Sequence, residues 1–277
     1  MSAVVNISCL WEWSWVFSEC LGRAYGHFLQ GDDVRVETLY SSKPFFYFLS
    51  DIKEEKLRED RGVPYAQKAY QNDFDPKKEW GEIWTPPPIK DYYSKTFDIS
   101  SQKPILIINN KYNIEWGVKP YNILDLDALF SIFTKFQSEF TIYYIRYDGS
   151  FHNKNSGYYD NVPSVPFDDY KMIREKFPKV NTIYDFMGEY DCDYNTAQCM
   201  LMSKSDRHIS VAGGNAVLSS YFSKDNIIFT GKNCPRNASN RAVWRDNSWL
   251  SVLSGSNIYG VMDNEQLIKR CEGLWLR

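Results

Sequence analysis

The chain has 277 residues, of which 24% are charged and 43% hydrophobic, and Trp, Tyr and Phe together make up 17%. This composition excludes a disordered chain, and the length is sufficient for one large core or two smaller ones. The formal net charge is −3, with 32 basic and 35 acidic residues, which argues against a protein that binds nucleic acid or an anionic membrane.

The N-terminal sequence and the cysteines give a first indication of the compartment. No apolar run approaches the ~20 residues that cross a bilayer, and residues 1–10 lack the features of a signal peptide. No two cysteines have CxxC spacing, so a zinc or thioredoxin-like site is unsupported. We therefore expect a cytoplasmic protein whose cysteines are free thiols.

The first hundred residues predict a small and irregular α/β unit. Apolar spacing indicates a strand over 4–9, a helix over 15–29 that ends at Gly31, and a strand over 34–40. The charged stretch 54–60 favours a solvated helix face. Three consecutive prolines at 86–88 exclude regular helix and central strand and indicate an extended connector.

From residue 104 onward, strands and helices alternate. The expected strands cover 105–108, 140–145, 182–186, 208–211 and 227–229, and the expected helices cover 124–136, 167–177, 196–204, 216–222 and 264–271. Such alternation predicts a parallel sheet with helices on both faces. The expected fold class is α/β, with a reduced domain over residues 1–100 and a Rossmann-like domain over residues 101–277.

Right-handed crossovers bring the carboxyl ends of all parallel strands to one edge of a sheet, where ligands bind. The polar and glycine residues that follow the expected strands are Asn110, Lys111, Arg146, Glu189, Gly213, Gly214 and Asn215. Two cations, together with glycines at the start of a helix, suit a nucleotide diphosphate, because free N–H groups and Lys or Arg bind its oxygens.

Each of these features also has a purely structural interpretation. Gly213 and Gly214 could simply form a tight turn from strand to helix, Lys111 could be a solvated surface residue, and Arg146 could be an ion-pair partner, for example of Asp148. The glycines do not form GxGxxG and follow the fourth strand, which disfavours a dinucleotide or S-adenosylmethionine site.

Three segments carry a family resemblance. Residues 105–117 (ILIINNKYNIEWG), 142–148 (IYYIRYD) and 208–222 (HISVAGGNAVLSSYF) resemble the nucleotide-sugar-binding half of GT-B-like glycosyltransferases. The chain is similar to small enzymes of bacteria and large DNA viruses, among them a xylosyltransferase that helps to build capsid glycans. The resemblance covers residues 104–232, and the first hundred residues are short for a complete second Rossmann domain.

The resemblance implies transfer of a sugar from a nucleotide diphosphate donor to a hydroxyl of a glycan acceptor. A UDP-sugar is the preferred donor, with UDP-xylose as one example, and the transfer would be inverting and would require no metal cofactor. It also implies that the seven strand-end residues bind the donor, with Glu189 at the ribose or base. For a viral chain the compartment would be the host cytoplasm.

An inverting enzyme needs a general base near the acceptor hydroxyl. The candidates in the first hundred residues are Glu12, His27 and Asp73. Glu12 follows the first expected strand but could equally cap the next helix. His27 could be a structural histidine within an amphipathic helix, and Asp73 a solvated loop residue.

Two further features complete the candidate site. Tyr158 and Tyr159 lie in a polar loop and are candidates for stacking on an acceptor sugar. Asp191 and Asp193 could hold Mg or Mn, although this fold usually works without a metal. The similar pattern at 125–127 favours helix capping.

The alternatives to a glycosyltransferase are a non-catalytic carbohydrate-binding protein and an S-adenosylmethionine-dependent methyltransferase.

Overall fold

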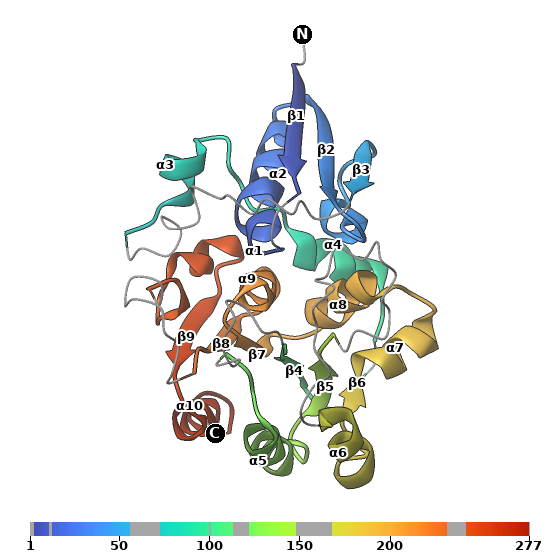
Figure 1. Cartoon of the computed structure of the whole chain (residues 1–277), viewed down its shortest axis with the longest axis vertical. Coiled ribbons are helices and arrows are strands. Elements are labelled where there is room, and N and C mark those ends of the chain that lie inside the picture. The colour runs from blue at the N-terminus through green and yellow to red at the C-terminus, as the bar shows by residue number, and fades with distance from the viewer. Residues whose placement is uncertain are drawn as a thin grey trace.

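The computed structural model describes residues 3–10, 13–55, 73–99, 101–112, 122–147, 168–231 and 242–276. These residues form two parallel β-sheets, with the smaller one at the top of Figure 1. The strands are β1 (Val4–Cys9), β2 (Asp33–Leu39), β3 (Ile52–Glu55), β4 (Ile105–Asn109), β5 (Thr141–Ile145), β6 (Asn181–Thr182), β7 (Arg207–Val211), β8 (Asp225–Phe229) and β9 (Asn257–Val261).

Helices surround both sheets. They are α1 (Trp13–Trp15), α2 (Leu21–Leu29), α3 (Pro76–Trp80), α4 (Ile89–Thr96), α5 (Leu126–Phe136), α6 (Asp169–Lys176), α7 (Ile183–Tyr190), α8 (Tyr194–Ser203), α9 (Gly214–Ser220) and α10 (Asn264–Trp275). A π-helical segment η1 (Val16–Cys20) joins α1 to α2, and short 3₁₀ segments are η2 (Lys43–Phe46) and η5 (Trp249–Leu253).

The large sheet has the strand order β6-β5-β4-β7-β8-β9, and all its strands are parallel. Counted along the chain, its strands lie in the order 3-2-1-4-5-6, which is that of a doubly wound nucleotide-binding sheet. The direction of winding reverses between β4 and β7, where Ile107 pairs with His208. In doubly wound sheets the crevice that binds ligands lies outside the carboxyl ends of the two strands at this point.

Side chains alternate between the two faces of the large sheet. Leu106 and Ile108 of β4 pack below the sheet against α5, while Ile105 and Ile107 pack above it. In Figure 1 helices α5, α6 and α10 lie below the sheet, and α8 and α9 lie between the two sheets. The apolar cluster above the large sheet continues into the small sheet; we call it the shared core, and its members include Trp15, Phe17, Phe45, Ile107, Ala216, Tyr221 and Trp249.

Hydrogen bonds also cross between the part before residue 100 and the part after it. Tyr221 Oη donates to the carbonyl of Phe17 at 2.7 Å. Helix α4 packs against α8, and Lys90 Nζ lies 2.6 Å from a carboxylate oxygen of Asp206. The small sheet contains only residues before 56 and the large sheet only residues after 104, but α4 contacts both parts.

The α/β fold class expected from the sequence is confirmed, as is most of the strand and helix pattern after residue 104. The expected strand over 182–186 is wrong, because β6 ends at Thr182 and Ile183 begins α7. Thr182 and Asp185 form a capping box, in which each side chain binds the backbone N–H of the other residue. Such a box starts a helix and overrides the strand preference of the apolar residues.

Three other elements differ from expectation. The proline run lies outside helix and strand, as expected, but helix α4, which was not expected, follows it directly with Pro88 as its N-cap residue. Strand β9 was not expected and adds a sixth strand to the large sheet. The charged stretch 54–60 begins within strand β3, and its residues after Glu55 lie outside the described part of the chain.

Cys9 and Cys20 form a disulfide between the end of β1 and the end of η1. The expectation of free thiols is therefore wrong for this pair. The free thiols among the described residues are Cys192, Cys199 and Cys271. The two cysteines are 11 positions apart in sequence, and α1 lies within the loop that the disulfide closes.

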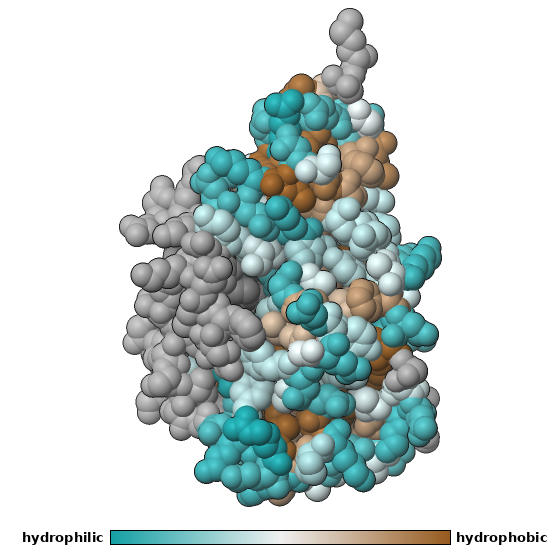
Figure 2. All heavy atoms as spheres, turned by 90° about the vertical axis from the view of Figure 1, so that its right-hand side faces the viewer, coloured by the Kyte–Doolittle hydropathy of each residue, from teal (hydrophilic) through white to brown (hydrophobic). Residues whose placement is uncertain are grey.

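Aromatic rings fill much of the space around the small sheet. Trp13 stacks on Phe17 with ring centroids 5.5 Å apart, and Phe17 contacts Phe45 edge-on at 4.8 Å. Figure 2 shows that hydrophobic residues also reach the surface over the upper, N-terminal part of the molecule. Phe28 of α2 and Tyr92 of α4 are exposed aromatic side chains. The aromatic excess of the first hundred residues is thus largely a means of filling a small core.

Candidate functional site

The switch point of the large sheet brings together residues that follow β4 and β7 and are about a hundred positions apart in sequence. Lys111 follows β4, and Gly213 follows β7. A Cβ atom built on Gly213 would lie 2.7 Å from Nζ of Lys111, so the ammonium group lies beside the glycine backbone. Gly213 has φ of +127°, a conformation that L side chains rarely adopt. The sequence-predicted Lys111 and Gly213 therefore meet at the switch point of the sheet.

Helix α1 packs directly against the second glycine, Gly214. A Cβ atom built on Gly214 would lie 3.3 Å from the backbone nitrogen of Ser14 and 3.3 Å from Cβ of Trp13. Both residues belong to α1, which begins at Trp13 a few residues after β1 ends. Within the described residues, no carbonyl or side chain accepts from the N–H of Gly214 or Asn215. The two halves of the chain thus face each other at the glycines.

Asn110 and Asn215 join the residues that follow β4 to the start of α9, which follows β7. The side chain of Asn215 donates to the carbonyl of Asn110 at 3.0 Å. The side chain of Asn110 is buried and points away from the crevice, because its Oδ1 accepts from the N–H groups of Lys111 and Leu124 and its Nδ2 donates to the carbonyl of Leu124. Asn110 therefore shapes the loop, and Lys111 is the residue that faces the glycines.

Arg146 lies at the end of β5 but is buried, with 2% of its surface exposed. Its Nε and Nη2 each donate to a different oxygen of Asp169 at 2.5 Å. Burial opposes the charged guanidinium, but the hydrogen bonds to Asp169, together with the electrostatic interactions with Tyr144, Asp169 and Tyr170, outweigh it and raise the pKa of Arg146. The interpretation of Arg146 as an ion-pair partner is therefore the one that its contacts favour, with Asp169 as the partner.

Glu189 and the candidate base His27 lie away from the crevice. Glu189 is an exposed residue of α7, because the strand expected before it is a helix. His27 lies near the end of α2, and its Nδ1 is 2.8 Å from Asp32, whose carboxylate accepts from the N–H of Ala3. Ala3 precedes β1, so His27 sits at the opposite end of that strand from α1. We do not retain His27 as a base or Glu189 as a donor ligand.

Four other candidate residues provide less information. Asp73 is exposed and precedes Phe74, whose ring packs on Trp249 with centroids 5.2 Å apart. Glu12, Tyr158 and Tyr159 lie outside the described residues. Glu12 is nevertheless one residue before Trp13 in sequence, and Trp13 contacts Gly214.

The carboxylates considered as metal ligands act at helix ends. Asp193 caps α8 by accepting from the N–H of Thr196 at 2.8 Å, and Asp191 is the exposed residue that ends α7. Asp125 caps α5 through the N–H of Ala128, which confirms the capping interpretation of that pattern. In the part of the chain that is described, no group of three or more His, Cys, Asp or Glu residues could hold a metal ion.

The sequence missed two groups of residues at this edge. Asp169 binds Arg146 and accepts a hydrogen bond from Tyr144. No local sequence signal identifies either residue. Asp169 is 23 residues from Arg146 in sequence, and Tyr144 resembles the other tyrosines expected in the core. Nor does any sequence signal assign Trp13 and Ser14 to the site. Their position beside Gly214 depends on how the two sheets pack, which a single sequence does not specify.

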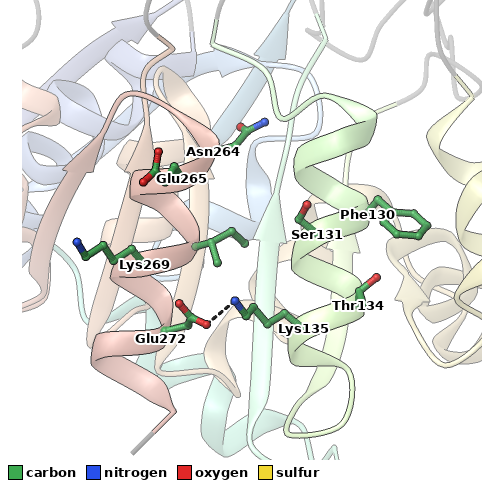
Figure 3. Close-up of a pocket in the computed structure, with 9 residues that line it drawn as sticks. Phe130, Ser131, Thr134, Lys135, Asn264, Glu265, Lys269 and Glu272 are labelled. Atoms are coloured by element: carbon green, nitrogen blue, oxygen red, sulfur yellow. Dashed lines mark ion pairs between the residues drawn. The ribbon is translucent and has the colours of Figure 1, made fainter.

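A separate groove of about 810 Å³ lies on the other side of the large sheet, between α5 and α10. Figure 3 shows Phe130 and Ser131 on one wall and Lys269 on the other, with Lys135 and Glu272 joined in an ion pair at one end. Charges of both signs line the groove, and none of the strand-end residues contributes to it. It is therefore distinct from the crevice at β4 and β7.

Comparison with known proteins places the fold. No protein-family model matches the chain, and no curated protein matches it. Among solved structures, the chain is similar to the ADP-heptose lipopolysaccharide heptosyltransferase II of Escherichia coli, with a TM-score of 0.55 and 8% sequence identity, over 99% of this chain and 98% of the other. The wall teichoic acid polymerase TagF is more distant, with a TM-score of 0.36 and 11% identity over 91% of this chain and 50% of that one.

The similarity to the heptosyltransferase shows that the chain has a GT-B glycosyltransferase fold. In Figure 1 the two sheets lie one above the other, and α1 between them packs against Gly214. None of the helices in the described ranges is long and apolar enough to span a bilayer.

Proposed function

We propose that this protein is a glycosyltransferase that takes its sugar from a nucleoside diphosphate donor and transfers it to a hydroxyl of a glycan acceptor. The observation that carries this proposal is the meeting of Lys111 and Gly213 at the switch point of the large sheet, opposite α1. Ligands of doubly wound sheets bind at this point. The GT-B fold over nearly the whole chain supports the same class of reaction.

In the proposed reaction, the acceptor oxygen forms a bond to the anomeric carbon of the donor, and the bond from that carbon to the diphosphate breaks. Negative charge then develops on the departing diphosphate. The ammonium of Lys111 and the N–H groups of Gly214 and Asn215 would stabilise this charge, because they are already positioned before the reaction. The roles proposed for Arg146 and Asn110 are indirect, since both side chains are engaged within the protein.

The acceptor proton must pass to a base on the side of the small sheet. Glu12 is the candidate that we retain, because it precedes Trp13 of α1 in sequence and Trp13 contacts Gly214. We propose an inverting, metal-independent transfer. The sequence resemblance favours a UDP-sugar, with UDP-xylose as the first donor to try.

The first test is a thermal-shift screen of the protein with UDP, GDP, ADP, CMP-sugars and S-adenosylmethionine, followed by calorimetry on any binder. A ligand that binds the native state raises the melting temperature. We expect a nucleoside diphosphate to bind and the matching nucleotide sugar to be hydrolysed slowly without acceptor. Binding of S-adenosylmethionine alone would indicate a methyltransferase, and glycan binding without nucleotide affinity would indicate a non-catalytic lectin-like protein.

The second test uses Lys111→Met with Lys95→Met as its matched control. Lys95 lies in the last turn of α4 and is exposed, so its loss removes the same charge far from the glycines. We expect Lys111→Met to weaken nucleotide binding at least tenfold, as the loss of a charged hydrogen-bond donor does. Equal affinities of the two variants would contradict the proposed site.

A further inference from the structure

A chain of buried hydrogen bonds runs from the loop that carries Lys111 to the first turn of α6. Asn110 Nδ2 donates to Tyr144 Oη at 2.9 Å, and Tyr144 Oη donates to Asp169 at 2.5 Å. Asn110, Tyr144 and Asp169 are each at most 1% exposed. The three residues come from the β4 end, from β5 and from α6, so the chain joins elements that are distant in sequence.

The far end of this chain is held rigidly. Both oxygens of Asp169 accept from the guanidinium of Arg146, and one also accepts from the N–H of Tyr170 at 3.0 Å. Burial, together with the neighbouring Asp169 carboxylate, raises the pKa of Tyr144 well above its usual range. The Tyr144 hydroxyl therefore keeps its proton and remains the donor to Asp169.

The near end of the chain sets the backbone beside the glycines. Asn110 accepts from the N–H of Lys111 at 3.0 Å and bonds to both the N–H and the carbonyl of Leu124. Because side chains alternate along the extended segment, a fixed Asn110 that points below the sheet directs Lys111 above it, toward Gly213. Any freedom of Asn110 would be transmitted to the position of the ammonium group.

Stability alone does not account for this arrangement. A buried ion pair contributes little more than apolar side chains of the same volume would, because desolvation offsets the attraction. A buried polar network that is fully hydrogen-bonded does fix a single geometry. The network lies within one residue of Lys111, at the edge of the sheet where geometry matters for binding.

We propose that Tyr144 is a positioning residue that acts through Asn110 to hold Lys111 at the diphosphate site. The inference rests on the proposed function, since it assigns to Lys111 a role in nucleotide binding. Arg146 and Asp169 anchor Tyr144 and do not touch the ligand themselves.

The test is a double-mutant cycle of Tyr144→Phe and Lys111→Met, read by calorimetry with UDP, GDP and ADP as probes. We expect Tyr144→Phe alone to raise the Kd of the nucleotide that binds about five- to tenfold, which is the effect of one lost hydrogen bond. In the Lys111→Met background, Tyr144→Phe should change the Kd less than twofold, because its effect passes through the lysine.

The control is Tyr170→Phe, which removes another buried tyrosine hydroxyl from the same network. Tyr170 Oη donates to the carbonyl of Arg146 and makes no bond to Asn110. We expect Tyr170→Phe to lower the melting temperature about as much as Tyr144→Phe but to leave the Kd unchanged. If Tyr144→Phe fails to melt cooperatively, Asn110→Ala takes its place in the cycle, with the same expected coupling.

The outcomes separate the two proposals. If no nucleotide binds the wild type, or if Lys111→Met leaves the Kd unchanged, the proposed function fails and this inference fails with it. If Lys111→Met weakens binding but Tyr144→Phe does not, or if the two effects add, then Tyr144 has no positioning role and the proposed function stands.

Discussion

The ammonium of Lys111 lies against the backbone of Gly213, so that a Cβ atom built on the glycine would be 2.7 Å from Nζ and 3.5 Å from Cε. The two residues follow neighbouring strands of the large sheet at its switch point. A side chain at position 213 would therefore compete with Lys111 for the same space and would also have to adopt φ of +127°.

Gly213→Ala should reduce nucleotide affinity more than tenfold and lower the free energy of unfolding by about 1–3 kcal/mol, because the methyl group displaces Lys111 and the backbone is strained. Calorimetry and urea unfolding measure the two effects. Gly188→Ala is the matched control, since a Cβ atom there meets nothing within 4 Å and the residue is exposed within α7. Unchanged affinity in Gly213→Ala would show that the lysine position does not depend on the glycine.

The buried pair of Arg146 and Asp169 predicts a characteristic pattern of stability changes. Arg146→Met should lower the free energy of unfolding by about 3–5 kcal/mol, because it leaves the Asp169 charge buried without its partner. The double variant Arg146→Met/Asp169→Asn should recover most of this loss, since the buried charge is then absent. Urea unfolding of the wild type, both single variants and the double variant gives the interaction free energy between the two residues. Additive losses would mean that the pair is not coupled.

His208 predicts a loss of stability in mild acid. Burial, followed by the nearby charge of Lys90, lowers the pKa of His208 to about 3. The unfolded chain binds the proton with a pKa of about 6.5, so protonation favours unfolding as the pH falls below that value. The contribution of His208 to the free energy of unfolding is therefore largest above pH 6.5 and should decrease by about 2 kcal/mol by pH 5.

The measurement is the free energy of unfolding of the wild type and of His208→Asn at pH 7 and pH 5. The asparagine cannot titrate, so the difference between the two proteins should shrink by about 2 kcal/mol between these pH values. The same dependence on pH in both proteins would assign the acid sensitivity to other groups.

The disulfide between Cys9 and Cys20 predicts a pattern of thiol reactivity and a stability contribution. Alkylation of the protein after unfolding without reductant should leave Cys9 and Cys20 unmodified while Cys192, Cys199 and Cys271 react, as peptide mass spectrometry would reveal. Cys20→Ser should lower the free energy of unfolding by about 2–3 kcal/mol, the value expected for a loop of this length. Cys192→Ser, which removes a half-buried free thiol, is the control. Alkylation of Cys9 in unreduced protein would rule out the bond.

The sheet and its candidate functional edge could be predicted from the sequence because the signals are local. The apolar run of β4 lies between a proline and polar residues, and Gly213-Gly214 marks the end of β7. The sequence therefore places Lys111 and Gly213 correctly after their strands. The residues Lys111 and Gly213 then meet as a geometric consequence of parallel strands.

The errors arose where a local pattern competes with a nonlocal partner. The apolar residues after Thr182 have the composition of a strand, but the capping box with Asp185 begins a helix there, so Glu189 could not lie at a strand end. Arg146 follows a strand as a ligand-binding residue would, yet its partner Asp169 comes 23 residues later in the sequence. Neither outcome can be read from spacing alone, because burial and pairing are decided by the tertiary fold.

The shared core has a consequence for the motion of the two halves. Its apolar side chains come from both sheets, with Phe17 and Tyr221 in direct hydrogen-bonded contact across the boundary. Rotating the halves apart would expose this surface to water at about 25 cal/mol for each Å². The two sheets should therefore keep their relative orientation when a ligand binds. The chain should also lose its structure in one cooperative step, so that a fragment containing only the small sheet would not fold in isolation.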